Sequence, residues 1–247
     1  MFLRLQIFLL TAWLSSFALA SPSAERVQEI RHLAFSAASN LLVYYSPKQD
    51  GGDPRYLERY QQDLRQLKEL VALEQDGALS TAVRNMEQRI AELQRQPASN
   101  AQLFPTWINP LLEEQARLDQ QLASRYAAVQ PADPVRLELH RLNLNVQRLQ
   151  LLYQTRVFGT LSVYLMPVDS STFADLDQQI LQGFAESERL KPVQGAELGK
   201  LKGKYEFIRP RLLQHDQKWV SGGAAFYLGQ VGDGLARLST AQALSGQ

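Results

Sequence analysis

The amino-acid sequence predicts an all-α protein, built as one or more antiparallel helical bundles with about eight helices. Apolar residues recur at intervals of three and four positions along most of the chain, which is the spacing of a buried helix face. No segment shows the sustained alternation, with a period of two, that marks a half-buried strand. With 45% hydrophobic and 21% charged residues, the composition is that of a protein with a packed core.

Residues 1–20 are predicted to be a signal peptide. Arg4 is the single charge before an apolar run over residues 7–17, and the sequence Ala-Leu-Ala at 18–20 has the small-residue pattern of a cleavage site. Cleavage there would leave Ser21 as the first residue. The run is shorter than the roughly 20 apolar residues that span a bilayer. An uncleaved membrane anchor is the alternative interpretation.

Four helices are predicted in the first half of the remaining chain. Asp53 precedes Pro54 and Asn109 precedes Pro110, so each pair offers a side-chain acceptor for free N–H groups and a proline with a helical φ angle. Between the third and fourth helices, residues 96–109 are expected to be irregular. The predicted helices cover residues 24–46, 54–75, 78–96 and 110–129.

Four more helices are predicted in the second half. Asp133 before Pro134 repeats the capping pattern, and Thr172 begins a capping-box spacing that ends in Asp175. Pro210 is expected to kink or end its helix. The predicted helices cover residues 134–165, 172–191, 196–214 and 217–240, and a flexible tail is expected over residues 241–247.

An internal repeat predicts that the two halves are duplicated four-helix units. The segment LLVYYSP at 41–47 resembles LSVYLMP at 161–167, an offset of 120 residues, and ARL at 116–118 recurs at 236–238 with the same offset. The predicted units cover residues 21–130 and 131–240. Two copies are too few for an extended solenoid, but they suit two bundles stacked end to end or merged along one side.

Charge and cysteine content exclude several classes of protein. Without residues 1–20, the chain carries 25 basic and 25 acidic residues, which argues against nucleic-acid binding and against attachment to anionic lipid by charge. Absence of cysteine excludes disulfides, thiolate metal sites and a thiol nucleophile. An exported chain without cysteine fits the bacterial periplasm best.

The sequence predicts no catalytic residues, no metal site and no cofactor. None of the three histidines belongs to a His-x-x-x-His motif, and His215 next to Asp216 has no nucleophile linked to it by a motif. Glu29 and His32 have the Glu-x-x-His spacing of di-iron bundles, but a two-fold carboxylate site would need a counterpart in the second half. These two residues support the alternative of a metal- or ligand-dependent enzyme or carrier.

Aromatic residues near the repeated segments and irregular connections are the candidate ligand- or partner-binding residues. They either close the ends of the bundles or line a pocket for a small organic ligand or peptide. An Arg turned inward beside a Tyr would be a candidate for holding a ligand carboxylate. The candidates are Tyr44, Tyr164, Trp107 and Tyr227.

Glycines recur with helical spacing in the last two predicted helices. An interior glycine lowers helix stability by about 1 kcal/mol relative to alanine. Another interaction should offset this loss, and close packing of the two helices is the expected one. A groove for a partner helix or flat ligand is the alternative. The residues expected to pack closely are Gly199 and Gly203 on one helix and Gly222 and Gly229 on the next.

Together these features predict an exported, non-enzymatic helical-bundle protein of the bacterial periplasm that binds an envelope protein or a small organic ligand. The first alternative is the enzyme or carrier built in the bundle core. The second is an accessory scaffold of an envelope machine, which would expose a long apolar stripe.

Overall fold

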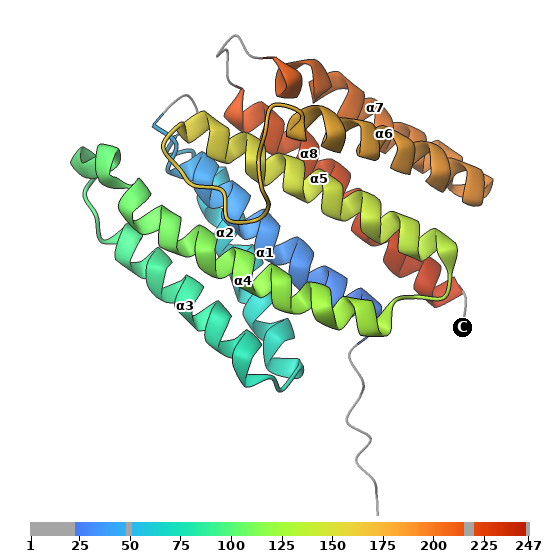
Figure 1. The fold of residues 1–247 in the computed structure, drawn as a ribbon, viewed down its shortest axis with the longest axis horizontal. Coiled ribbons are helices and arrows are strands. Elements are labelled where there is room, and N and C mark those ends of the chain that lie inside the picture. The colour runs from blue at the N-terminus through green and yellow to red at the C-terminus, as the bar shows by residue number, and fades with distance from the viewer. Residues whose placement is uncertain (1–22, 48–50, 215–219, 246–247) are drawn as a thin grey trace, which may run out of the picture.

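A computed structural model describes residues 23–47, 51–214 and 220–245, and the predicted all-α fold is confirmed: these residues form helices and no strand (Figure 1). The predicted signal peptide lies outside the described residues. None of the helices in these ranges is long and apolar enough to cross a bilayer. The elements are α1 (Ala24–Tyr44), α2 (Pro54–Leu73), α3 (Gly77–Gln94), η1 (Ala98–Leu103), α4 (Pro105–Val129), α5 (Pro134–Phe158), α6 (Thr172–Leu190), η2 (Pro192–Gln194), α7 (Gly195–Leu213) and α8 (Ser221–Ser245).

The helices form two four-helix units that lie side by side (Figure 1). In the first unit, α1 packs against α2 and α4, and α3 closes the bundle between them. In the second, α5 packs against α6 and α8, and α7 closes it in the same way. Contacts of α1 with α5 and α8 join the two units. Each unit has its own cluster of buried apolar side chains, although Leu151 and Phe158 of α5 belong to the first cluster.

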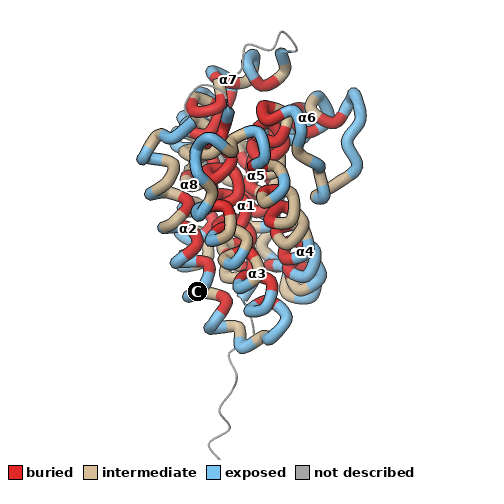
Figure 2. The backbone as a smooth tube through the Cα atoms, turned by 90° about the vertical axis from the view of Figure 1, so that its left-hand side faces the viewer, coloured by how far each residue is buried: buried red, intermediate tan, exposed pale blue. Residues whose placement is uncertain are grey.

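Helix α1 is buried on all sides in the centre of the molecule (Figure 2). Every residue from Ile30 to Val43 is buried, including Arg31, His32 and Ser36. A helix in that position has no solvated face, so its polar side chains must find partners on neighbouring helices. The candidate functional site arises from these partners.

Two of the three predicted Asp or Asn caps are confirmed. Asp53 accepts a hydrogen bond from the backbone N–H of Arg55 at the start of α2, and Asp133 accepts one from Val135 at the start of α5. The prediction for Asn109 was wrong, because α4 begins at Pro105 and contains Pro110. The side chain of Asn109 instead accepts a hydrogen bond from the backbone of Ser162.

Two predicted helix ends were also wrong. Helix α5 stops at Phe158 because Gly159 adopts a left-handed conformation with φ of 76°, and residues 159–171 are irregular, whereas the apolar pattern predicted a helix to residue 165. Helix α8 continues to Ser245, so residues 241–245 belong to it and not to a flexible tail.

The repeated segments lie in different settings. Residues 41–44 form the buried last turn of α1, whereas residues 161–167 lie in the irregular segment after α5. The sequence match between residues 41–47 and 161–167 is therefore not a structural equivalence. Duplication of the whole four-helix unit stays a prediction.

Candidate functional site

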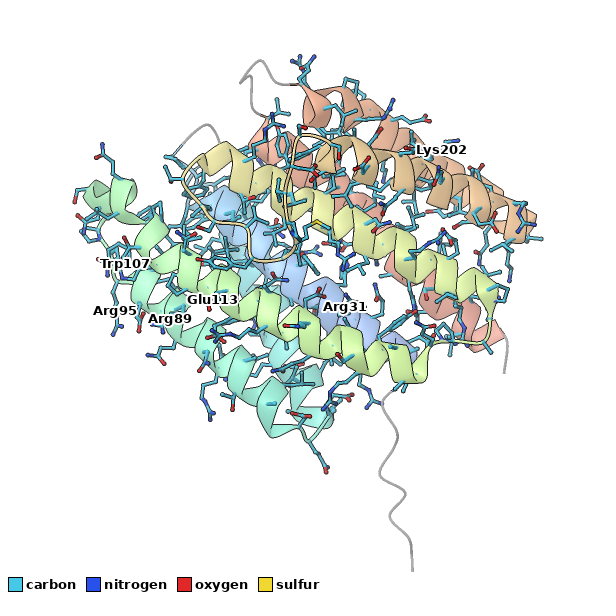
Figure 3. All side chains as sticks on the ribbon, viewed as in Figure 1. Arg31, Arg89, Arg95, Trp107, Glu113 and Lys202 are labelled. Carbon is cyan, nitrogen blue, oxygen red and sulfur yellow. The ribbon has the colours of Figure 1, made fainter. Side chains whose placement is uncertain are left out.

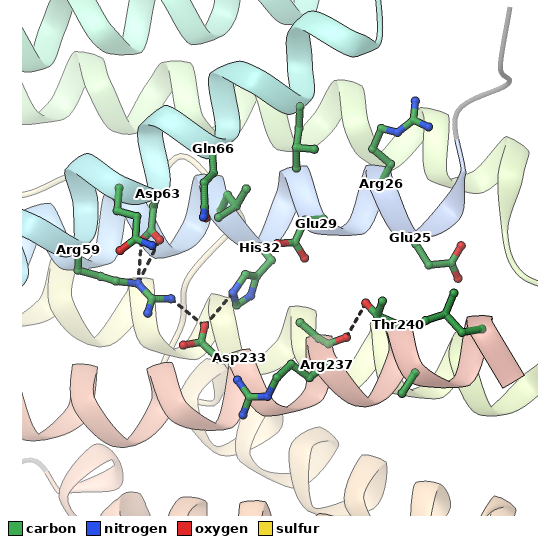
Figure 4. Close-up of a pocket in the computed structure, with 16 residues that line it drawn as sticks. Glu25, Arg26, Glu29, His32, Arg59, Asp63, Gln66, Asp233, Arg237 and Thr240 are labelled. Carbon is green, nitrogen blue, oxygen red and sulfur yellow. Dashed lines mark hydrogen bonds and ion pairs between the residues drawn. The ribbon is translucent and has the colours of Figure 1, made fainter.

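A cavity of about 720 Å³ opens between α1, α2 and α8, where the two units meet (Figure 4). We call it the main cavity. Its volume is within the range of about 300–1,000 Å³ that is typical of small-molecule sites. It is lined by Glu25, Arg26, Glu29, His32, Leu33, Arg59, Gln62, Asp63, Gln66, Leu70, Asp233, Ala236, Arg237, Thr240, Ala241 and Leu244.

Four charged or titratable side chains form a hydrogen-bonded chain along the wall of the main cavity (Figure 4), and Ser36 extends this chain beyond the cavity. Nε2 of His32 lies 3.1 Å from Oδ1 of Asp233, and Nη2 of Arg59 donates to the same oxygen at 2.8 Å. Nε of Arg59 also donates to Oδ1 of Asp63 at 3.1 Å. Ser36 donates to the other oxygen of Asp63 at 2.6 Å. The chain therefore connects α1, α2 and α8 through side chains.

Protonation within this cluster follows from burial and the neighbouring charges. Burial alone would lower the pKa of His32, but the hydrogen bond and negative charge of Asp233 outweigh it and raise the pKa. Burial would raise the pKa of Asp233, but hydrogen bonds from His32 and Arg59 lower it to about 2. For Asp63, burial dominates and raises the pKa despite the charge of Arg59. The cluster thus holds Asp233 ionised and shifts the pKa of His32 upward.

Two further charges on the wall have no such partner. Glu29 is half-buried and Arg237 is exposed, and neither makes an ion pair or hydrogen bond with another described residue. The remaining lining includes apolar side chains, of which Leu33 is buried and Leu244 is 71% exposed at the C-terminal end of α8. The main cavity therefore offers a ligand both signs of charge and an apolar surface.

A smaller cavity of about 260 Å³ adjoins the main cavity and shares Arg59 and Asp233 with it. Its wall includes Ser36, Phe226 and Gly229. The ion pairs of Arg59 thus separate two spaces between α2 and α8.

The polar groups of this cluster are already hydrogen-bonded to one another. Both ring nitrogens of His32 have partners, because Nε2 contacts Asp233 and Nδ1 lies 3.1 Å from Nε2 of Gln147. The hydroxyl of Ser36 donates to Asp63, so no hydroxyl is paired with the imidazole as a nucleophile would be. Within the described ranges, no three His, Asp or Glu side chains converge as metal ligands would, which leaves Glu29 and His32 without a third ligand.

His140 forms a separate, closed polar cluster. Its Nδ1 lies 2.8 Å from the hydroxyl of Tyr126, and its Nε2 lies 2.6 Å from the hydroxyl of Ser239. All three side chains are buried, and burial lowers the pKa of His140 to about 4. The adjoining space of about 10 Å³ is too small for a ligand, so this cluster joins α4, α5 and α8 structurally.

The four predicted aromatic residues do not form one site. Tyr44 and Trp107 are half-buried against the first apolar cluster, and Figure 3 shows Trp107 near the beginning of α4. Tyr227 packs against Phe207 at a ring distance of 4.8 Å on the second unit. Tyr164, which is 43% exposed, lines a different cavity between α4 and α5.

The predicted close packing of the glycine stripe was wrong at three positions. A Cβ atom added at Gly199, Gly203 or Gly229 would meet nothing within 4 Å, and the first two glycines are exposed. Gly222 is buried, but its carbonyl accepts a hydrogen bond from Tyr56 of α2 and so marks a contact with α2.

Close approach occurs instead at Gly234 and Gly232 of α8. A Cβ atom on Gly234 would overlap the side chain of Leu201 on α7. One on Gly232 would overlap the amide of Gln147 and crowd the ring of His32. Close packing thus occurs on α8 and not at the exposed glycines of α7, and it involves Gly232, which shares the spacing of the predicted stripe, and Gly234, which does not.

Sequence reasoning missed Arg59, Asp63 and Asp233 as site residues. Arg59 and Asp63 are four residues apart, as an ion pair on one helix face requires, and Asp63 lies next to Leu64 of the apolar stripe. These signals were available. The contact between His32 and Asp233 could not be predicted from the sequence, because it joins residues 201 positions apart.

No protein-family model, no curated protein and no solved structure matches this chain.

Proposed function

We propose that this protein is an exported, non-enzymatic binding protein of the bacterial envelope that holds a small zwitterionic organic ligand in the main cavity. The observation that supports the ligand class is the presence of Glu29 on α1 and Arg237 on α8, two opposite charges without ion pairs among the described residues, in the lining of a cavity of about 720 Å³. Leu70 and Leu244 would contact the apolar part of the ligand. The pairing of both nitrogens of His32 supports binding without chemical conversion.

The binding proposal is tested by titrating the purified protein with amino acids and betaines and recording the melting temperature. A ligand at 100 times its dissociation constant should stabilise the protein by about 2.7 kcal/mol. Matched uncharged amides and alcohols should bind at least about tenfold more weakly, because they lack the charged groups. If no zwitterion raises the melting temperature, the ligand class is wrong.

Variants of the two unpaired charges locate the site. Glu29→Gln and Arg237→Gln should each weaken binding by about tenfold or more. Glu197→Gln and Arg84→Gln change the same residue types at exposed positions outside the main cavity and should leave binding unchanged. Unchanged affinity in both cavity variants would place the ligand elsewhere.

Export is proposed from Arg4, the apolar run at 7–17 and the Ala-Leu-Ala sequence at 18–20. Expression of the whole chain in a bacterium should yield a periplasmic protein whose N-terminal residue is Ser21. Retention of Met1 in the membrane fraction would favour the uncleaved anchor instead.

A second candidate function is binding of a partner protein. It is favoured by an aromatic patch on α7 and α8, where Phe207 is 67% and Phe226 is 52% exposed and both lie beside Tyr227. A partner that binds there should be lost from the complex with Phe207→Ser but not with Val193→Ser, which alters another exposed apolar residue.

A further inference from the structure

A second cavity, of about 640 Å³, lies between α4, α5 and the irregular segment 159–171, and shares no lining residue with the main cavity. We call it the Arg148 cavity. The backbone of Ser162 donates a hydrogen bond of 2.9 Å to the side chain of Asn109, which links the segment to α4. The segment supplies an apolar wall, and α4 and α5 supply a charged one. Its lining includes Arg148, Asp119, Glu113, Tyr164, Leu165 and Pro167.

At the inner end of this cavity, one carboxylate faces two guanidinium groups. Oδ1 of Asp119 accepts a hydrogen bond of 2.7 Å from Nε of Arg31, and both side chains are buried. Arg148 approaches the same carboxylate only to 3.9 Å, between its Nη2 and Oδ2 of Asp119. Figure 3 shows Arg31 in the centre of the bundle and Glu113 further along α4. The charge of Asp119 is therefore already engaged by Arg31.

Arg148 is left with unused hydrogen-bonding capacity. Its side chain is 27% exposed, and its Nε is fully buried without a hydrogen-bond partner in the described structure. A guanidinium group stays charged in proteins and presents its donors in a planar fork that matches a carboxylate. Burial lowers the pKa of Arg148, and Asp119 only partly offsets this effect. An anion bound at this end of the cavity would pair with the part of the guanidinium group that lines it.

We propose that the Arg148 cavity binds a small organic carboxylate with an apolar body. Arg148 pairs with the carboxylate, and Tyr164, Leu165 and Pro167 contact the body of the ligand. This site is separate from the one proposed for the zwitterion, and it brings an Arg and a Tyr together at a cavity wall.

The charges around the cavity favour a monoanion over phosphate. Asp119 and Glu113 both line the wall, so a dianion would meet two carboxylates. Glu113 is paired with Arg117 at 2.6 Å, which reduces its repulsion of a single negative charge. The apolar wall also gives a bare inorganic ion nothing to contact, whereas it would bury the body of an organic acid.

The ligand class is tested by calorimetric titration of the purified protein with benzoate and hexanoate, and with benzamide, hexanamide and inorganic phosphate for comparison. Saturable binding of one carboxylate per chain is expected. The neutral amides should bind about tenfold more weakly or worse, because they lose the charge-assisted pair. Tighter binding of phosphate than of either carboxylate, or no saturable binding of either acid, overturns the proposal.

Substitutions of Arg148 test whether the carboxylate binds in the Arg148 cavity. Arg148→Met should weaken benzoate binding by about tenfold or more, and Arg148→Lys should give an intermediate affinity because it keeps the charge without the fork. Arg141→Met is the matched control on α5, since Arg141 is 65% exposed and outside the cavity. The affinity of the Arg141→Met variant for benzoate should equal that of the unmodified protein.

Tyr164→Ala keeps the proposal testable if Arg148→Met fails to fold, because Tyr164 lies in the exposed segment. It should weaken binding of benzoate. Glu29→Gln and Arg237→Gln should leave benzoate binding intact, which separates this site from the main cavity. Unchanged affinity in both Arg148→Lys and Tyr164→Ala contradicts the assignment.

Discussion

At the scale of single residues, two buried histidines acquire opposite protonation behaviour from their neighbours. His32 lies beside the carboxylate of Asp233, which raises its pKa against the effect of burial. His140 lies between the hydroxyls of Tyr126 and Ser239, so burial is not opposed by a contacting charge and its pKa falls to about 4. Folding therefore shifts the pKa values of the two histidines in opposite directions.

The neutral state of His140 predicts a loss of stability in acid. Since its pKa is about 4 when folded and 6.5 when unfolded, the unfolded chain binds the extra proton between these values. The contribution of His140 to the free energy of unfolding is present above pH 6.5 and falls by about 3 kcal/mol on acidification to pH 4. Urea titrations of the protein and of His140→Asn across this range should show that difference.

His32 provides a control, because its contribution to the free energy of unfolding should change with pH in the opposite direction to that of His140. Because its pKa is raised by folding, its contribution is present below pH 6.5 and is lost as the pH rises through the folded value. His32→Asn should therefore lose more stability in acid than at alkaline pH. The same pH trend in both histidine variants would contradict these assignments.

The glycines of α8 predict different responses to one substitution. Gly229→Ala should raise stability by up to about 1 kcal/mol, because its Cβ meets nothing and alanine favours the helix. Gly234→Ala should be less stable than Gly229→Ala by about 1–3 kcal/mol, because its Cβ overlaps Leu201. Thermal melts of the two variants provide the comparison. Equal stability would mean that Leu201 moves aside freely.

At the scale of helices, apolar periodicity predicted where each element lies, and local chemistry decided where it ends. Asp53 and Asp133 could be recognised as caps because the cap hydrogen bond is made within two residues. The end of α5 was missed because Leu161 and Val163 extend the apolar pattern beyond Gly159, where the backbone turns left-handed. Those side chains are apolar because they pack on the apolar clusters from the irregular segment.

The pairing of α6 with α7 predicts the effect of removing one charge. Asp177 accepts hydrogen bonds from Tyr205 at 2.7 Å and from Nε of Arg209 at 2.6 Å. Asp177→Asn should lower the free energy of unfolding by about 1–3 kcal/mol, because an amide cannot accept all of these bonds. Glu197→Gln, on the exposed face of α7, should change it by less than about 0.5 kcal/mol. Urea titration measures both, and equal effects would refute a structural role for Asp177.

At the scale of the whole molecule, α1 makes the two units mutually dependent. It contributes to the first apolar cluster and also contacts α5 and α8. The sequence predicted the number of helices because periodicity is a local property. It could not predict the main cavity, because the contact between His32 and Asp233 depends on how α1 and α8 pack.

This dependence predicts a single unfolding transition for the whole chain. In a chain starting at Ser21 with Trp219→Phe, the fluorescence of Trp107 reports on the first unit, whereas far-ultraviolet circular dichroism reports on both. The two signals should have the same urea midpoint, as expected for cooperative unfolding. Separate midpoints would show that the units unfold independently.

The position of α8 has a consequence for the order in which the protein can fold. A chain is synthesised from its N-terminus, so α1 and α2 exist long before Asp233 is made. Until then, His32 and Arg59 lack the carboxylate that pairs with both of them in the folded protein. His32 of α1 must therefore wait for the last helix of the chain before it gains its carboxylate partner, and a nascent chain without α8 would be a target for chaperones.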